Sequence, residues 1–156
     1  MRFSLHTLKR GLLFFWALWL SIVFLTNLMD LLRYSGILNQ SWTFTSGNLD
    51  FMVQTTAIML VPRPVVLLLF LGVLVWEAAS ALLLWRAFAA FRGIFAGGLN
   101  TVYTAFAVSL ALWAAFMIAD ELFLAYDVEA THMRIFIAQL VTLLALRLLP
   151  EEGALG

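Results

Sequence analysis

Four long apolar runs divide the chain, and the charged residues gather in the stretches between them. Crossing about 30 Å of hydrocarbon takes roughly 20 helical residues. The runs predict membrane spans at residues 12–29, 65–85, 101–119 and 130–149. The fourth span is long enough only if its helix starts near Ala130 and Arg147 extends its charged end to water. The pattern therefore predicts an all-α transmembrane four-helix bundle that forms one domain, 1–156.

Composition supports this prediction and narrows the possible functions. The chain has 156 residues, of which 64% are hydrophobic and 12% charged, whereas soluble domains are about 45–50% apolar and 25% charged. A water-soluble globule, a disordered chain and a DNA-binding surface are excluded, so we expect a lipid bilayer and no nucleic acid as partner. The chain has no cysteine, which excludes disulfides, thiolate metal sites and cysteine nucleophiles.

The distribution of charge predicts which way the bundle faces. The first span is too long for the apolar region of a signal peptide and no cleavage site follows it, so we interpret it as a retained anchor. Arginine and lysine concentrate on the cytoplasmic side of membrane proteins, which favours cytoplasmic termini. That side would carry Arg2, Lys9, Arg10, Arg86, Arg92 and Arg147, against Arg33, Arg63 and Arg134 outside. The outer side would be acidic, with Asp30, Asp50, Asp120, Glu121, Asp127 and Glu129.

Two local patterns predict how the bundle is built. The one long loop, 31–64, lies outside, and within it Phe51 to Val61 is apolar enough for a short helix on the membrane surface that ends at Pro62 and Pro64. Small residues spaced four apart let membrane helices approach closely. We therefore expect contact faces at Ala78, Ser80 and Ala81 in the second span and at Ala107, Ala111, Ala115 and Ala119 in the third.

Glu77 is the most informative single residue. It lies about 18 Å along the second span from its outer end, where an ionised carboxylate must be protonated, paired or next to water. One interpretation is a proton- or cation-binding site. The alternative is a structural hydrogen bond between helices or a contact with a partner subunit, which we prefer slightly because no second acid lies at that depth.

A second polar group lies near the predicted outer surface. Asn27 and Asp30 share a helix face, and Asp127 would share the face of Asp120 if the third helix continued. The fourth span opens with His132 and Arg134, and together these side chains could form a polar mouth between three helices. Carboxylates and histidine suit a divalent metal. The plainer interpretation, in which Arg134 pairs with an acid at the interface, predicts no metal.

The layout resembles a bacterial family of predicted small four-span integral membrane proteins of unknown function. The resemblance rests on short motifs, namely Asn48-Leu49-Asp50-Phe51, Trp76-Glu77, Trp113, Asp120-Glu121-Leu122-Phe123 and His132-Met133-Arg134-Ile135-Phe136. The acidic turn departs from the Gly-Gly-Glu-Trp-Phe typical of the family. The resemblance implies a bacterial inner membrane and no particular activity, and it directs attention to Asp50, Trp76, Glu77 and Glu121.

Two classes of function follow. We find no nucleotide-binding, zinc-protease or serine-hydrolase motif, and His6 and His132 are expected on opposite sides of the membrane, so no haem can bridge them. We therefore predict no catalytic residue and no cofactor. The preferred hypothesis is a non-enzymatic accessory or scaffold subunit that binds a membrane-protein partner or a second copy. The alternative is a small transporter or channel component that uses Glu77 as a proton or cation site.

Overall fold

The computed structural model describes residues 4–91 and 98–150, and within them the chain is helical. Its helices are α1 (Leu5–Tyr34), α2 (Asn48–Ala57), α3 (Arg63–Ala90), α4 (Leu99–Leu122) and α5 (Tyr126–Leu148). All except α2 are long and apolar enough to cross a membrane, and each coincides with a predicted span. The prediction of an all-α, multi-pass membrane protein is confirmed at this level.

The short helix lies earlier in the chain than the sequence predicted. We expected it over Phe51 to Val61, but it spans Asn48–Ala57, and the chain then turns through Leu60, whose φ is +53°. The two prolines belong to α3 instead, because Pro62 is its N-cap and Pro64 lies in its first turn, where a missing N–H costs nothing. The prediction of this helix was wrong by three residues at its start.

The turn between α4 and α5 also differs from the prediction. α5 begins at Tyr126 rather than near Ala130, because the chain reverses at Leu124, whose φ is +56°. α4 ends at Leu122, so the condition under which Asp127 would share the face of Asp120 is not met. The tight reversal brings the start of α5 against the end of α4, which is how side chains from these two segments come to meet.

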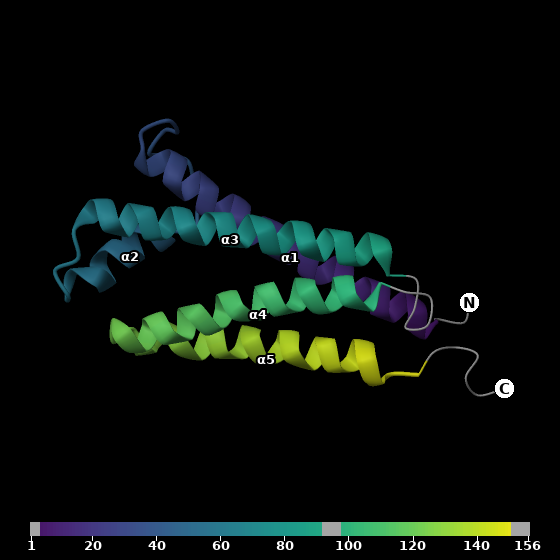
Figure 1. Cartoon of the computed structure of the whole chain (residues 1–156). Coiled ribbons are helices and arrows are strands. Elements are labelled where there is room, and N and C mark those ends of the chain that lie inside the picture. The colour runs from purple at the N-terminus through teal and green to yellow at the C-terminus, as the bar shows by residue number, and fades with distance from the viewer. Residues whose placement is uncertain (1–3, 92–97, 151–156) are drawn as a thin grey trace.

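The long helices form two pairs that α3 and α4 connect (Figure 1). α1 packs against α3, α4 packs against α5, and α3 packs against α4. The beginning of α1 meets the end of α5, where the Lys9 Nζ donates to the Leu149 carbonyl at 2.7 Å. We call this the terminal end and the opposite one, which carries α2, the α2 end.

The core lies in the half of the bundle nearest the terminal end. It joins side chains from all four long helices, including Leu13, Leu20, Leu84, Phe106 and Leu146. Indole N–H groups link the helices within it. Trp16 Nε1 donates to Thr142 Oγ1 at 3.0 Å, and Trp85 Nε1 donates to Ser21 Oγ at 3.0 Å. A second, smaller core around Leu49, Phe70 and Leu74 holds α2 against α3.

The two predicted rows of small residues differ in whether the bundle buries them. Ser80 and Ala81 of α3 are buried, as expected for a contact face. The row on α4 is not, because Ala107 and Ala111 are exposed and Ala115 and Ala119 are only half-buried. α4 instead buries a neighbouring face with Ala105, Phe106, Ser109, Leu112 and Trp113. Large side chains fill the space between the two helix pairs, and a face of alanines would leave it empty.

Candidate functional site

Glu77 sits halfway along α3 and is almost fully buried, with 1% of its surface exposed. Its Oε1 accepts a hydrogen bond from Asn27 Nδ2 of α1 at 2.6 Å. Asn27 Oδ1 in turn accepts from Asn48 Nδ2 at the start of α2, at 2.8 Å. The sequence placed Asn27 with Asp30 near the outer surface, and it gave no sign that α1 packs on α3 in the register that joins Asn27 to Glu77.

The second carboxylate oxygen of Glu77 is different. Oε2 is buried and has no hydrogen-bond partner among the described residues. Buried polar groups in native structures are nearly always paired, and each exception calls for an explanation. Glu77 therefore has one satisfied and one free acceptor at mid-span.

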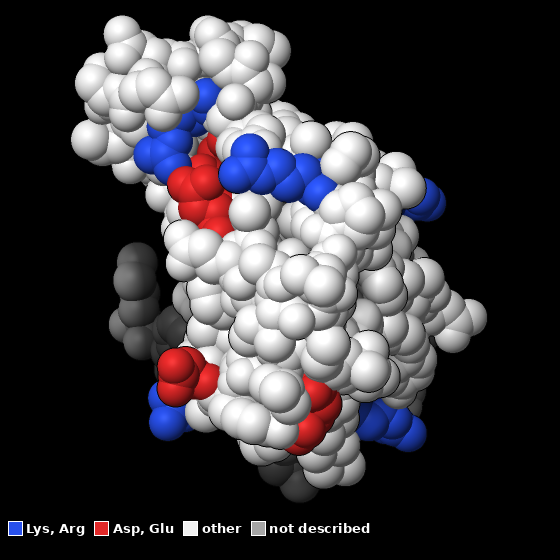
Figure 2. Space-filling model, turned by 90° about the vertical axis from the view of Figure 1, so that its left-hand side faces the viewer, with Lys and Arg blue, Asp and Glu red and all other residues white. Residues whose placement is uncertain are grey.

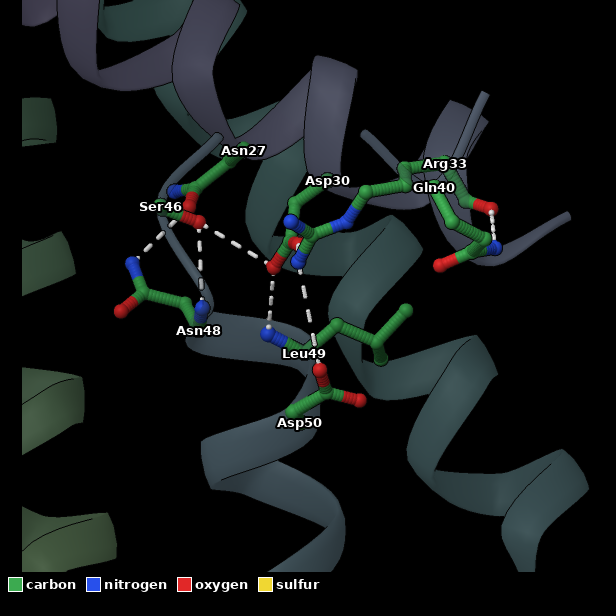
Figure 3. Close-up of polar contacts among 8 residues, drawn as sticks. All are labelled: Asn27, Asp30, Arg33, Gln40, Ser46, Asn48, Leu49 and Asp50. Carbon is green, nitrogen blue, oxygen red and sulfur yellow. Dashed lines mark hydrogen bonds and ion pairs between the residues drawn. The ribbon is translucent and has the colours of Figure 1, made fainter. Parts of the chain in front are cut away.

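Asp30 has a structural role in attaching α2 to α1 (Figure 3). Gly47, the N-cap of α2, has no side chain to bond the first amides of the helix. Asp30 supplies that cap from α1, because its Oδ2 accepts from the Leu49 N–H at 2.9 Å and from Ser46 Oγ at 3.2 Å. Its Oδ1 accepts from Arg33 Nη2 at 3.0 Å. A carboxylate at a helix start satisfies free N–H groups and suits the positive end of the helix dipole.

Asp50 and Trp76 differ in what their contacts contribute to the structure. Asp50 lies 4.0 Å from the Arg33 guanidinium and is 62% exposed, so this ion pair is weak. Trp76 Nε1 donates to the Val108 carbonyl of α4 at 2.9 Å, which fastens α3 to α4. Of the two motifs that the sequence singled out around these residues, the one with Trp76 joins α3 to α4, and in the other Asn48, rather than Asp50, bonds to α1.

The expected polar mouth is only partly formed. Asp120 at the end of α4 pairs with His132 of α5, with 2.6 Å between Oδ2 and Nδ1. The His132 ring stacks on Phe116 with ring centres 4.9 Å apart. Arg134 and Glu121 are exposed. The interpretation in which Arg134 pairs with an acid is not met among the described residues, and the pair that forms at Asp120 is with His132.

The α2 end carries the acidic residues that the sequence assigned to one side, together with three arginines. Figure 2 views this end and shows a few small groups of charged side chains, with acidic and basic residues next to one another, on a largely uncharged surface. Within the described part of the chain, no three His, Cys, Asp or Glu side chains are grouped closely enough to hold a metal ion.

A cleft separates the two helix pairs at the α2 end. Its volume is about 680 Å³, and it extends from the loop before α2 down to Glu77 at mid-span. Glu77 and Asn27 belong to one wall, and Asp120, His132 and Trp113 to the other. The remaining lining is mostly apolar and includes Val23, Phe51, Met52, Leu68, Leu69, Phe70, Val73, Leu112, Ala115, Phe116, Ala119 and Phe123.

The sequence missed one member of this site. Trp113 is 3% exposed, and its Nε1 has no hydrogen-bond partner among the described residues. A tryptophan in an apolar helix looks like packing, and nothing in the sequence shows that this one lines a cleft with an unpaired N–H. Two residues of the lining, Glu77 and Trp113, therefore each carry a buried polar atom without a partner among the described residues.

The motifs that suggested a family resemblance converge on this cleft. Asn48, Trp76, Glu77, Trp113, Asp120, Phe123 and His132 all line it, whereas Asp50, Glu121 and Arg134 do not. The resemblance itself stays a prediction. Comparison of the chain with protein-family models, with curated proteins and with solved structures found no match.

Proposed function

We propose that this protein is a non-enzymatic accessory subunit of a larger membrane complex and that the cleft receives an apolar segment of its partner. The observation that carries the proposal is the cleft itself, about 680 Å³ of space with largely apolar walls. Cavities of this kind, with a few polar groups on apolar walls, are the usual form of binding sites.

The small residues of α4 support this proposal. Ala115 and Ala119 line the cleft, and Ala107 and Ala111 continue the row on the exposed surface of the same helix. Within a bilayer, small residues at a spacing of four let a second helix approach the backbone closely. Because the row contributes little to packing within the bundle, it is available to a helix from outside.

Site-specific photo-crosslinking in native membranes tests the proposal. A photoreactive residue at Phe51 or Phe123, which line the cleft, should crosslink the same discrete protein, which then co-purifies in stoichiometric amount in mild detergent. The matched control is Leu82, which is exposed on α3 outside the lining and should crosslink only lipid. A crosslink between two copies would identify the partner as a homo-oligomer. A monodisperse monomer with no crosslinks specific to the cleft contradicts the proposal.

The unpartnered Oε2 of Glu77 favours a second candidate function, a proton or cation site in a small transporter or channel component. The carboxylate lies at mid-span beside a cleft that extends to one end of the bundle. On this proposal Glu77→Gln abolishes flux in proteoliposomes while the bundle stays folded, because glutamine keeps the oxygen that accepts from Asn27. Glu121→Gln removes a charge outside the lining and should leave flux unchanged. Absence of flux in the wild type rules this function out.

We further propose a bacterial inner-membrane location with both termini in the cytoplasm. The support is the excess of arginine and lysine at the terminal end, although Arg2 and Arg92 lie outside the described residues. The chain has no cysteine, so single cysteines report cleanly on sidedness. A membrane-impermeant maleimide should label Thr43→Cys in intact cells and Pro150→Cys only after permeabilisation. The reverse labelling would show that the orientation is inverted.

A further inference from the structure

The chemistry of the cleft indicates what its occupant carries. Glu77 Oε2 is a buried acceptor with no partner, and an unsatisfied polar group in hydrocarbon is costly. Charged residues within membrane spans normally pair with another group. A donor supplied by the occupant would satisfy this oxygen, and none is supplied by the described residues of the chain.

The charges around the cleft favour a cation as that donor. The lining contains the carboxylates of Glu77 and Asp120, and none of the described lining residues is Lys or Arg. Asp120 already has a partner in His132 at 2.6 Å. Arg33, the arginine that lies near this part of α1, is engaged by Asp30 at 3.0 Å. Glu77 is therefore the lining acid that has an oxygen without a partner among the described residues.

The size and surroundings of the cleft suit a helix. A helix with its side chains is a cylinder about 10 Å across, so a volume of 680 Å³ encloses roughly six of its residues completely. A helix that enters the cleft to only half its width would fill the same volume with twice that length, which is about three turns. Ala115 and Ala119 give such a helix close access to α4, and Ala107 and Ala111 extend that access below the cleft. A helix lying along this row passes the depth of Glu77.

Building on the proposed docking function, we propose that the partner segment is a transmembrane helix with a lysine or arginine near mid-span, whose cationic group donates a hydrogen bond to Glu77 Oε2. The apolar lining and the small-residue row provide contact area, and Glu77 selects the helix that carries a cation at the matching depth. A polar pair between membrane helices contributes modestly to affinity and strongly to register, because a displaced cation would face hydrocarbon.

The test uses the full-length protein in liposomes with synthetic helices as probes. Each probe is a polyleucine helix with an alanine stripe and one variable central residue, which is lysine, acetyl-lysine, leucine or glutamate. Association is measured by energy transfer from the tryptophans to an acceptor on the probe, and oriented circular dichroism confirms that each probe spans the bilayer. The lysine probe should associate about tenfold more tightly than the acetyl-lysine probe, which has nearly the same shape without the charge.

Two protein variants identify the pairing residue. Glu77→Gln should reduce the difference between the lysine and acetyl-lysine probes to less than about twofold. Glu121→Gln, which removes an exposed carboxylate at the same end outside the cleft, should leave the tenfold difference in place. If Glu77→Gln does not fold, the comparison of the two probes on the wild type still tests the proposal.

The outcomes separate this inference from the proposed function. Equal, tight association of the lysine, acetyl-lysine and leucine probes overturns the pairing and leaves helix docking intact. Association of none of the probes overturns both. A further outcome also overturns the inference. If no helix binds, but dodecylamine binds where dodecanol does not and Glu77→Gln abolishes this binding, the cleft is assigned to an amine-bearing lipid.

Discussion

The two halves of the bundle differ in how closely their helix pairs approach each other. In the half nearest the terminal end, side chains from all four long helices meet in one core, and the Trp16 and Trp85 N–H groups each find a partner on another helix. In the half nearest the α2 end, the helix pairs are separated by the cleft. Glu77 and Trp113 line the cleft, and each has a polar atom without a partner among the described residues. The same is true of Ser80, Ser109 and Gln139, which lie outside the lining.

The difference separates a half in which side chains of all four long helices meet from a half in which a cleft lies between the helix pairs. A packed interior gives every atom a neighbour, so a change there is felt directly as lost packing. The open half leaves apolar surface and hydrogen-bonding capacity unused, and the polar groups that hold α2 keep this half in shape. Each of the following predictions compares one residue whose contacts are complete with a matched residue whose contacts are not.

The largest expected effect is the loss of a core aromatic ring. Phe106 is fully buried in the packed half, so Phe106→Ala should lower the free energy of unfolding by about 3 kcal/mol by leaving a cavity. Phe51 lines the cleft and is 39% exposed, so Phe51→Ala should cost less than about 1 kcal/mol. Equilibrium unfolding in mixed micelles measures both, and equal losses would show that the two halves do not differ in packing.

The next effect concerns the attachment of α2. Asp30→Ala removes the carboxylate that caps α2 and pairs with Arg33. We expect the free energy of local unfolding of α2 to fall by about 2 kcal/mol. Amide hydrogen exchange at residues 48–57 should then accelerate about 30-fold. Asp50→Ala removes the same charge from an exposed position and should change exchange less than about twofold. Slow exchange in Asp30→Ala would mean that packing against α3 alone holds α2.

The smallest effect separates two tryptophans that both line the cleft. Trp76→Phe deletes the hydrogen bond to the Val108 carbonyl and should cost about 1 kcal/mol of unfolding free energy. Trp113→Phe removes the same ring volume, but Trp113 Nε1 has no partner among the described residues, so no hydrogen bond is lost. Trp113→Phe should therefore lower the unfolding free energy by about 1 kcal/mol less than Trp76→Phe does. The same unfolding measurement compares the two variants, and an equal or larger loss in Trp113→Phe would contradict the prediction.

Much of the fold could be predicted because the bilayer imposes it. The apolar runs specify four membrane-crossing helices, since backbone groups in hydrocarbon must bond within the segment. The position of Glu77 near the middle of α3 also follows from counting residues along an apolar run. The start of α2 could not be read in the same way, because its cap comes from Asp30, which precedes it by almost twenty residues.

Only the tertiary structure decided which polar groups meet. Hydropathy reports how deep a residue lies and says little about which face of a helix it occupies, because every face of a membrane helix is apolar. For this reason the sequence assigned Asn27 to Asp30 and the alanines of α4 to the bundle interior. The packing of α1 on α3 instead joins Asn27 to Glu77, and the bulk of Phe106 and Trp113 turns the alanines outward. The sequence by itself determined the spans and the depth of their polar residues. The rotation of each helix about its axis follows from side-chain packing between helices, and this rotation creates the cleft and leaves Glu77 Oε2 without a partner.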